Sequence, residues 1–545
     1  MKFKFKKPLS VLLAVMMLVS AFSFTVSAVD TETQTAVSAK DYGLSPTIHD
    51  GAILHAWCWS FNTIKESLPK IAEAGFTSVQ TSPISQCLVG NGGRLKLNGG
   101  WYYHYQPTLY TIGNYQLGTL DEFKSMCSEA DKYGIKIIVD VVANHCSWDY
   151  NAISSQIKNI PDAFHPNMEI ANYSSRYQVT RGMLSGLWDL NTANPSIQQM
   201  IKNYLNDCIA AGADGFRYDA AKHIELPNEP AEGGVDFSSD FWTNILDNDA
   251  EFQYGEVLQG QADKFADYAE LMNVTASAYG ENLRNSLESN KLAARVVTSY
   301  QSSGVTADKL VTWVESHDNY CNDSSYLHIT DDQVRIGWAI IASKGDTTPL
   351  FFSRPRNSSA TNMWGDDILG IEGNGNYYHP EVVAVNHFRN AMIGEPCNAG
   401  AIDRNYAHVY IQRGDKGVVI INYSDKDFDV NTGTAMPDGD YTDEAYGNSY
   451  TVTNGKISGT VKANTVAVIY NRESEDYGII GDVNGDGQIN VLDSTEIRKY
   501  AAQKVILDDR QLYVADVNDD GSVDVLDATE IQKFAVQKIS EFKKK

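Results

Sequence analysis

The sequence predicts a (β/α)8 TIM barrel with a small inserted domain, followed by an antiparallel β-sandwich and a small calcium-binding module. Three observations lead to this prediction. Between residues 48 and 394, eight short runs rich in β-branched residues alternate with helical patterns. Helical periodicity is absent from residue 395 to 471, and an acidic loop occurs twice between residues 478 and 540. A chain of 545 residues has room for several domains.

The first 28 residues have the pattern of a secretory signal peptide. A basic start precedes an apolar stretch over residues 9–24, and small residues lead to Ala28. A membrane anchor is the alternative, but the apolar run is short and is interrupted by Ser20 and Ser23. We therefore expect cleavage after Ala28 and export of the protein.

The barrel is predicted from eight candidate strands within residues 48–394. Several of them are continuously apolar, as expected of strands that are buried on both faces. The candidate strands are 53–59, 78–82, 135–142, 215–219, 252–257, 295–300, 310–316 and 349–352.

Two further regions differ in pattern from the barrel. Residues 146–187 are rich in Asn, Ser, Tyr and Pro and are too long for an ordinary loop, so they predict a small inserted domain after the third strand. Residues 395–471 show short β-branched runs between Gly, Asp and Asn turns, which predicts a β-sandwich. A short charged linker, 472–477, follows.

Composition excludes several classes of function. The net charge of −25 disfavours binding to nucleic acid or to an anionic membrane, whereas a neutral substrate is not repelled. The seven cysteines are dispersed without short paired spacings, so they indicate neither a disulfide scaffold nor a zinc cluster. Their odd number leaves at least one thiol free, and the sequence does not determine any pairing.

Polar residues stand at the ends of four predicted strands, where a structural strand would not need them. Because the carboxyl ends of barrel strands share one rim, we expect these side chains to meet in one cleft. They are Asp219, Glu256, Asp318, His145, His317 and Arg217. Three carboxylates in one cleft repel each other, which raises at least one pKa, while Arg217 keeps a neighbour ionised. One protonated and one ionised carboxylate is the requirement of glycoside hydrolysis.

A metal-dependent hydrolase is the alternative from another class. His145 and His317 could bind zinc together with the carboxylates. No strand presents an H-x-H pair and no H-E-x-x-H helix occurs, which argues against this alternative.

The four strand-end segments resemble, in order and spacing, the signature regions of the α-amylase family (glycoside hydrolase family 13) over residues 48–470. The resemblance implies that Asp219 is the nucleophile, Glu256 the general acid/base and Asp318 the transition-state stabiliser, and that Arg217 orients Asp219. A nucleophilic carboxylate makes the reaction retaining, which requires about 5–5.5 Å between the carboxyl groups of Asp219 and Glu256.

The same resemblance implies a set of sugar-binding residues. His145 and His317 would bind the central sugar, and Lys222 and His223 would contact the leaving-group side. An aromatic loop after the second strand would line the donor subsites. Its residues are Trp101, Tyr102, Tyr105 and Gln106. The alternative for Trp101 and Tyr102 is a local aromatic core.

A structural calcium ion between the barrel and the insertion is also implied. Its expected ligands are Asn144, Asp189, and the backbone carbonyls of His223 and Thr180. Chloride-binding members of the family have Asn just before the His-Asp of the seventh strand. This chain has Ser316 there, which argues against a chloride site.

The C-terminal repeat has the ligand spacing of an EF-hand calcium loop, with Gly at position 6 and Asp at position 12. Each loop leads into an amphipathic pattern, and no clear helical pattern precedes either loop. The candidate ligands are Asp482, Asn484, Asp486, Gln488, Asn490 and Asp493 in the first loop, and Asp516, Asn518, Asp520, Ser522, Asp524 and Asp527 in the second.

A duplicated unit of one loop and one helix resembles a type I dockerin, which implies a cohesin domain of a scaffold protein as partner. The alternative is a calcium module that only stabilises the C-terminus. In many dockerins the two positions before the last ligand carry hydroxyl residues that contact the cohesin. Here they are Val491-Leu492 and Val525-Leu526, which predicts an apolar contact.

Together these features predict a secreted, scaffold-bound, endo-acting α-amylase that hydrolyses α-1,4-glucosidic bonds of starch-like glucans by a retaining double displacement. A maltogenic enzyme or a transglycosylase of the same family is the nearest alternative, because all three use the same catalytic residues. A non-catalytic starch-binding scaffold component is the alternative from another class, and the complete carboxylate set argues against it.

Overall fold

The computed structural model describes residues 42–90, 95–260, 263–300, 304–470, 479–507 and 509–544. The predicted signal peptide 1–28 and linker 472–477 lie outside these residues. Across the described ranges, no helix is both long and apolar enough to span a membrane.

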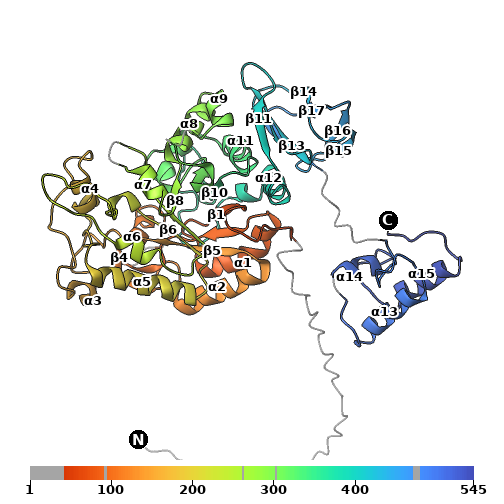
Figure 1. Cartoon of the computed structure of the whole chain (residues 1–545), viewed down its shortest axis with the longest axis horizontal. Coiled ribbons are helices and arrows are strands. Elements are labelled where there is room, and N and C mark those ends of the chain that lie inside the picture. The colour runs from red at the N-terminus through yellow and green to blue at the C-terminus, as the bar shows by residue number, and fades with distance from the viewer. Residues whose placement is uncertain are drawn as a thin grey trace, which may run out of the picture. The chain divides into compact units, whose positions relative to one another are not determined.

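Eight parallel strands form a closed barrel in the order β1-β10-β9-β8-β7-β6-β5-β2, which confirms the predicted fold class (Figure 1). Most strands are buried throughout, as β6 and β10 show. The strands are β1 Ile53–His55, β2 Ser78–Gln80, β5 Lys136–Val141, β6 Gly215–Tyr218, β7 Phe252–Gly255, β8 Asn273–Thr275, β9 Leu310–Trp313 and β10 Thr348–Phe352.

The sixth strand was predicted in the wrong place. Residues Ala294–Thr298 form the short helix α9, in which Val296 and Val297 are buried. The sixth strand is instead β8, which pairs with β7 and β9. Because β8 has only three residues, it leaves no apolar run in the sequence, whereas two adjacent valines in α9 imitate one.

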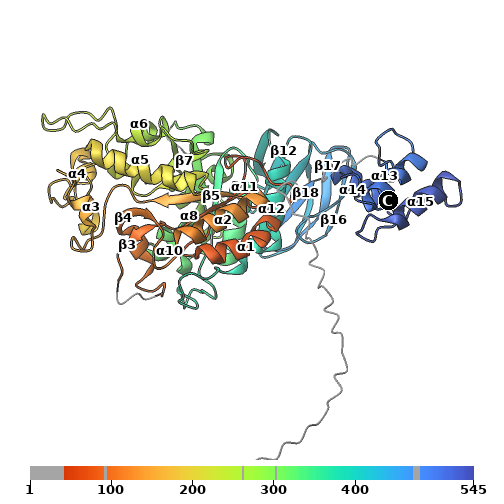
Figure 2. The ribbon, with the colours of Figure 1, turned by 90° about the horizontal axis from the view of Figure 1, so that it is seen from below.

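Amphipathic helices surround the strands (Figure 2). Helix α2 shows why such a segment starts and stops: a Thr119–Glu122 capping box begins it, and Gly134 ends it in the left-handed conformation with φ 66°. The longer helices are α1 Phe61–Glu73, α2 Leu120–Tyr133, α5 Pro195–Ala210, α8 Ser277–Glu288, α11 Asp331–Ala342 and α12 Pro380–Ala391. Shorter ones are α6 Phe241–Ile245, α7 Phe265–Ala269 and α10 His317–Cys321.

Irregular segments connect the barrel elements. After β2, a two-stranded sheet pairs β3 Ser85–Cys87 with β4 Pro107–Ile112. Within the predicted insertion lie α3 Ser155–Lys158 and α4 Arg176–Arg181. Short 3-10 segments are η2 Trp101–Tyr105, η3 Leu184–Gly186, η4 Ala221–His223, η5 Ala307–Lys309, η6 Ser325–Leu327 and η7 Gly375–Tyr378.

Two four-stranded antiparallel sheets follow the barrel, with orders β11-β12-β13-β18 and β14-β17-β16-β15. Alternate residues of β13 serve two cores, because Val418 and Ile420 pack between the sheets while Val419 and Ile421 join the barrel core. This double burial explains why β13 is apolar at successive positions. The strands are β11 Cys397–Ala401, β12 His408–Arg413, β13 Gly417–Asn422, β14 Phe428–Gly433, β15 Gly439–Thr442, β16 Ser449–Thr453, β17 Lys456–Val461 and β18 Thr465–Tyr470.

The C-terminal module contains α13 Val491–Ala501, α14 Asp509–Ala515 and α15 Val525–Ala535 around its own small core. Helices α13 and α15 follow the two acidic loops, as predicted. Helix α14 directly precedes the second loop, which corrects the expectation that neither loop has a helix in front of it. With seven residues, α14 is too short to show helical periodicity, although its Val514 is fully buried.

All seven cysteines are free thiols, and five of them are buried. Most therefore behave as small apolar residues of the core.

Candidate active site

The three predicted catalytic carboxylates lie at the carboxyl ends of their strands. Asp219 follows β6 and Glu256 follows β7. Asp318 is the second residue of α10, the helix after β9. The amide of Asp219 donates to Val141 O at 2.9 Å and that of Glu256 to Tyr218 O at 2.8 Å, so the parallel ladder continues to both residues. These bonds place the two side chains side by side at one rim.

All three carboxylates line one cleft of about 400 Å³. Seven of the predicted sugar-binding residues line it as well. They are Trp101, Tyr102, Tyr105, His145, Lys222, His223 and His317. A cleft of this size with convergent polar groups is typical of a ligand site.

Arg217 is the electrostatic centre of the site. Its Nη1 lies 2.8 Å from Asp219 Oδ1, and its Nη2 lies 2.9 Å from Glu256 Oε2. Nη1 also donates to both oxygens of Asp140, at 2.7 and 2.8 Å. One buried guanidinium therefore forms ion pairs with three carboxylates and brings Asp219 and Glu256 close to each other.

Asp140 is a site residue that the sequence reasoning missed. It is fully buried in β5 and also accepts a hydrogen bond from the Tyr105 hydroxyl at 3.0 Å. The available signal was one carboxylate within an otherwise apolar strand, since a buried charge of this kind is rare without a partner.

Three of the four carboxyl groups in this cluster, Asp140, Asp219 and Asp318, hold protons more strongly than isolated groups. Burial raises the pKa of Asp219 well above its usual range; Arg217 opposes this shift, and the charges of the neighbouring carboxylates add to it. Burial and the Glu256 charge raise the pKa of Asp318 to about 7. Burial also disfavours ionised Glu256, but Arg217 and the Ala220 amide leave its pKa below the usual value. A proton retained at neutral pH therefore lies on one of the groups whose pKa is raised, such as Asp219 or Asp318, rather than on Glu256.

The pKa of Asp219 is thus raised and that of Glu256 lowered in the substrate-free cleft. The predicted roles require the opposite, an Asp219 that Arg217 keeps ionised and a Glu256 that carries the proton. One guanidinium cannot compensate four carboxylates in a buried site, because desolvation penalises each negative charge.

The histidines at the rim are held by backbone and ring contacts. The ring of His145 contacts Tyr105 O through Nε2 at 3.1 Å. His317 stacks on Tyr105 with 5.1 Å between ring centroids and 11° between planes, and its Nε2 lies 3.7 Å from Asp318 Oδ1. Burial lowers the pKa of both His145 and His317 to about 4, so both are neutral hydrogen-bonding groups at neutral pH.

One wall of the cleft is aromatic. Trp101 packs edge-on against both Tyr105 and His317, while Tyr102 is 38% exposed at the rim. Exposure at the rim favours a surface for sugar rings over a closed aromatic core. Gln106 does not line the cleft; its side chain accepts hydrogen bonds from Ser147 Oγ and from the Trp148 amide, both at 3.4 Å.

The cleft is also lined by four residues that were not predicted from the sequence, three of them leucines. They are Leu184, Ser185, Leu187 and Leu258. Ser185 has φ 54° and Gly186 has φ 77°, so a tight turn with two left-handed residues separates Leu184 from Leu187. No short sequence motif predicts these two leucines as cleft residues, because their position depends on the turn at Ser185 and Gly186.

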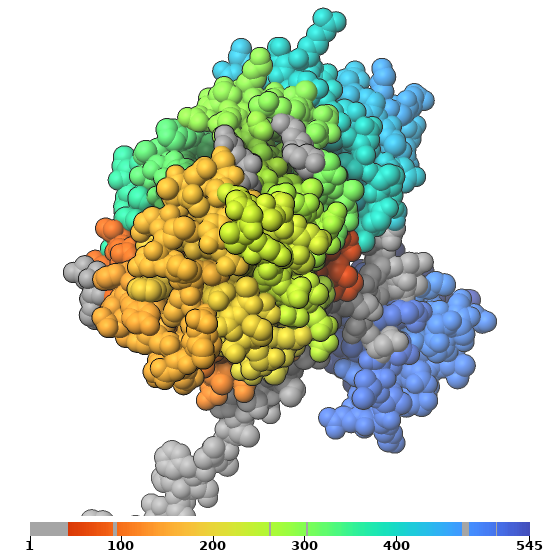
Figure 3. Space-filling view, turned by 60° about the vertical axis from the view of Figure 1, so that its left-hand side comes forward, coloured from red at the N-terminus to blue at the C-terminus, as the bar shows by residue number. Residues whose placement is uncertain are grey.

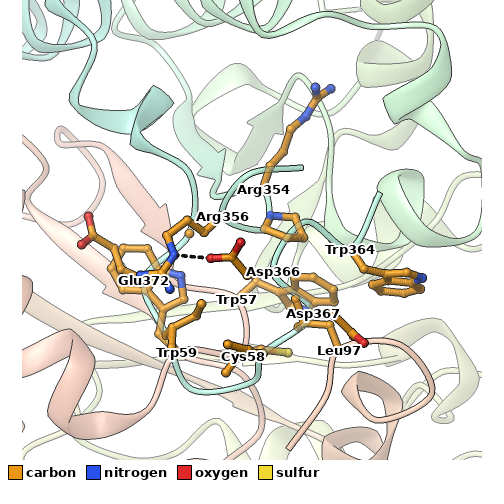
Figure 4. A pocket seen from close by; sticks show the side chains of 14 residues that line it. Trp57, Cys58, Trp59, Leu97, Arg354, Arg356, Trp364, Asp366, Asp367 and Glu372 are labelled. Atoms are coloured by element: carbon orange, nitrogen blue, oxygen red, sulfur yellow. Dashed lines mark hydrogen bonds and ion pairs between the residues drawn. The ribbon is translucent and has the colours of Figure 1, made fainter. Parts of the chain in front are cut away.

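A second, much smaller pocket contains none of the predicted site residues (Figure 4). It lies between the segment after β1, with Trp57 and Trp59, and the segment after β10. The ion pair between Arg356 Nε and Asp366 Oδ2, at 2.8 Å, spans it. Asp366, Asp367 and Glu372 line it, but Asp366 is paired with Arg356 and the pocket is far smaller than the cleft.

The predicted ligands of the barrel calcium ion lie together. Asn144 and Asp189 are buried, with Asn144 Nδ2 3.2 Å from Asp189 Oδ1, and Thr180 lies in the last turn of α4, where carbonyls lack helical partners. Burial and the nearby Glu225 charge raise the pKa of Asp189 well above its usual range. Among the described residues, no three His, Cys, Asp or Glu side chains form a metal-holding group. The donors that remain, one carboxylate, one amide and carbonyls, suit calcium.

The two C-terminal loops wrap around their first and last acidic residues. Asp482 and Asp493 are buried, and each accepts backbone N–H groups of its own loop. Asp516 and Asp527 are buried in the same way in the second loop. Burial, with the charges of Asp516 and Asp520, raises the pKa of Asp527. Each loop thus concentrates negative charge that a hard cation would compensate.

Family models match two parts of the chain. The model for the α-amylase catalytic domain matches residues 60–330, and the model for the dockerin type I domain matches residues 480–534.

Two curated relatives are similar over most of the chain. An α-amylase of Butyrivibrio fibrisolvens is 43% identical over 469 residues, which are 78% of this chain and 47% of that protein. An α-amylase of Clostridium acetobutylicum is 39% identical over 448 residues, 80% of this chain and 56% of that protein. The chain therefore spans about half the length of the curated relatives it matches.

Among solved structures, the wild-type α-amylase I of Eisenia fetida is similar with a TM-score of 0.65 and 22% identity, over 79% of this chain and 97% of that one. At this identity the likeness concerns the fold.

Proposed function

Because residues 60–330 belong to the α-amylase catalytic-domain family and residues 480–534 to the dockerin type I family, we propose that this protein is a secreted, endo-acting α-amylase borne on a scaffold. Its substrate would be the α-1,4-glucosidic bonds of starch-like glucans. The observation that carries the proposal is the pairing of Asp219 and Glu256 on one guanidinium, with Asp318 in the same cleft.

The arrangement supports a double displacement. Asp219 attacks the anomeric carbon and forms a glycosyl ester, while Glu256 gives its proton to the departing glycosidic oxygen. Glu256 then takes a proton from water, whose oxygen attacks the same carbon and releases Asp219. Asp318 and the neutral histidines would hold the sugar hydroxyls, and Lys222 and His223 the leaving-group side.

The proton for the first step comes from the cluster itself. In the substrate-free cleft the pKa values of Asp219 and Asp318 are raised and that of Glu256 is lowered, so a proton must pass from one of the first two groups to Glu256 before the bond breaks. Transfer from Asp219 would also leave that carboxylate ionised for its attack on the anomeric carbon.

The first prediction concerns pH. Because the pKa of Asp318 is raised to about 7, kcat/KM should fall as pH rises through that value and Asp318 loses its proton. Removing one negative charge by Asp318→Asn should lower the pKa of Glu256 and move the alkaline limb to lower pH. The residual activity of Asp318→Asn on a long maltooligosaccharide, which needs protonation of its glycosidic oxygen, gives its profile, and a limb at unchanged pH would contradict the shared proton.

Soluble starch tests the proposed function directly. An endo-acting hydrolase lowers viscosity early, before many reducing ends appear, whereas an exo-acting maltogenic enzyme releases reducing ends with little loss of viscosity. A transglycosylase would lengthen part of a maltooligosaccharide pool. Absence of any product from starch would favour the non-catalytic alternative.

Calcium would act on structure rather than on chemistry. Bound by Asn144, Asp189 and the carbonyls of Thr180 and His223, it would tie the insertion to the segment that carries Lys222. When bound, it would also neutralise the buried charge of Asp189.

The second prediction follows from these ligands. Removal of calcium by a chelator should lower the melting temperature and the activity, and calcium but not zinc should restore both. Asp189→Asn should weaken the dependence on calcium, and Asp149→Asn in the same insertion is the matched control. Unchanged melting without calcium would exclude these ligands.

The C-terminal module would attach the enzyme to a cohesin. Val491, Leu492, Val525 and Leu526 are 54–58% exposed at the starts of α13 and α15, so they belong to the surface rather than to the core. Two equivalent apolar pairs offer two alternative binding orientations. We infer that the second loop binds calcium more tightly, because it has four carboxylates against three, although Lys544 Nζ lies 3.5 Å from Asp516.

The third prediction addresses this surface. Changing both pairs to Ser-Thr should weaken scaffold binding by at least about tenfold, because exposed apolar anchors supply most of such an interface. Starch hydrolysis should not change. Ile506→Ser, at a position 94% exposed in the same module, is the matched control. Equal scaffold affinity of all variants would exclude the apolar pairs as the contact.

The domain limits predicted from the sequence, 48–394 for the barrel, 395–471 for the sandwich and 478–540 for the dockerin, are retained as part of this proposal. Export through the signal peptide 1–28 is retained with them.

A further inference from the structure

A buried ion pair joins the insertion to the segment that follows β6. Arg176 begins α4, and its side chain is 6% exposed; the partner Glu229 is completely buried. Arg176 Nε donates to Glu229 Oε1 at 3.0 Å, and Nη2 contacts the same carboxylate. The two regions, orange and yellow-green, lie side by side on one face of the molecule (Figure 3).

The Nη1 and Nη2 groups of Arg176 also donate hydrogen bonds to a backbone carbonyl and to a tyrosine hydroxyl near the cleft. Nη1 donates to the carbonyl of Lys222 at 2.8 Å, and Nη2 donates to the Tyr268 hydroxyl at 2.9 Å. The Tyr268 hydroxyl in turn contacts the carbonyls of Ile224 and, at 3.3 Å, Lys222. The carbonyls of Lys222 and Ile224, the residues on either side of His223, are therefore held by one buried guanidinium and one buried hydroxyl.

This segment is also held in a costly conformation. Ala220 has φ 48° and ψ 34°, in the left-handed region that a residue with a Cβ adopts at a cost of about 1 kcal/mol. That conformation directs the Ala220 amide to Glu256 Oε2 at 3.0 Å. Lys222, two residues later, lines the cleft, and its Nζ donates to Leu258 O at 3.2 Å. Without an external anchor, the segment would relax and both contacts would change.

The contacts of Arg176 indicate what the ion pair is for. A buried ion pair is by itself weak support for stability, because desolvation offsets the attraction between the charges. Here, however, the guanidinium also bonds to a loop carbonyl, and no residue of the ion pair lines the cleft. The pair therefore orders the segment 220–224 rather than contacting substrate.

We propose that Arg176 is a positioning residue that holds segment 220–224 against the cleft and so sets the leaving-group side of the site. The inference rests on the proposed function, because it takes Lys222 and His223 to contact the sugars that leave.

Two substrates separate this role from a purely structural one. A long maltooligosaccharide occupies the leaving-group side and needs protonation of its glycosidic oxygen. A maltooligoside of an activated phenol has no sugar on that side and needs little protonation. With Arg176→Met, kcat/KM for the maltooligosaccharide should fall about 10–100-fold, the loss expected for one charge-assisted hydrogen bond. For the aryl substrate it should change less than about threefold, and both assays are run well below the melting temperature.

Matched variants keep the test decisive if Arg176→Met folds poorly. Tyr268→Phe removes only the hydroxyl that reaches Ile224 and Lys222, and should show the same substrate bias at smaller size. Arg176→Lys retains the charge and should restore part of the maltooligosaccharide activity. Arg335→Met breaks another partly buried ion pair, with Glu381 at 2.8 Å, whose residues do not line the cleft. It should lower the melting temperature without changing the ratio of the two activities.

The outcomes are distinguishable. If both substrates lose activity equally in Arg176→Met and Tyr268→Phe, or if neither does, Arg176 has no positioning role. If the unmodified protein hydrolyses neither substrate, the proposed function itself is wrong.

Discussion

Asp219→Asn should abolish turnover of starch while the protein remains folded. The substitution removes the nucleophile, and losses of about 10⁴-fold or more are usual when a covalent catalyst is removed. The fold should tolerate it, because Asn can still accept the hydrogen bond from Arg217 Nη1 and a repelled negative charge disappears. Reducing-end release and the melting temperature measure the two effects.

The control for this variant is Asp366→Asn, which weakens the ion pair with Arg356 in the small pocket outside the cleft. It should keep activity within about twofold of the unmodified enzyme, as surface changes generally do. Activity of Asp219→Asn above about one per cent would contradict its role as nucleophile. Azide should restore turnover of an activated substrate by Asp219→Gly, with inversion at the anomeric carbon, only if Asp219 occupies the attacking position.

Glu256→Gln should be nearly inactive on starch but not on every substrate. General acid catalysis contributes about 10²–10⁴-fold, and a glutamine cannot supply the proton. Gln can still accept the Ala220 amide, so the geometry around Arg217 should persist. An aryl maltooligoside with a good leaving group needs less protonation, so its kcat/KM should fall much less. Equal losses on both substrates would show that Glu256 does not act chiefly as the acid.

The comparison of the two variants is informative by itself. Asp219→Asn should fail on both classes of substrate, because every route passes through the glycosyl ester. Only Glu256→Gln should distinguish leaving groups. The reverse pattern would exchange the roles of the two carboxylates, although both bind the same guanidinium.

Much of the site could be predicted because its residues stand at strand ends. A parallel barrel brings the carboxyl ends of all strands to one rim. Once the strands before Asp219, Glu256 and Asp318 are predicted, these three residues are therefore expected to lie close together. The two acidic loops could also be predicted from the sequence, because the spacing of their ligands is local and each loop leads directly into a helix. The strands β6, β7 and β9 could be predicted because each is a short, mostly buried segment that leads directly to a carboxylate or to the His317-Asp318 pair.

Local patterns failed where an element is short or where contacts are remote. Strand β8 and helix α14 have three and seven residues, too few for a period to emerge. The position of Leu184 and Leu187 in the cleft depends on a turn at Ser185 and Gly186, and their role is visible only once the aromatic residues of the cleft are placed.

Spacing within a few residues is enough to predict the order of the domains, the class of barrel, the strand-end carboxylates that meet in the cleft and the two acidic loops. The distribution of charge depends instead on the fold: Asp140 shares Arg217 with Asp219 and Glu256, and burial raises the pKa of both Asp219 and Asp318. The hydrogen bond from Arg176 to the carbonyl of Lys222, 46 residues later in the chain, likewise depends on the fold. Desolvation and long-range hydrogen bonds depend on what surrounds a group in space, and no local spacing records that surrounding.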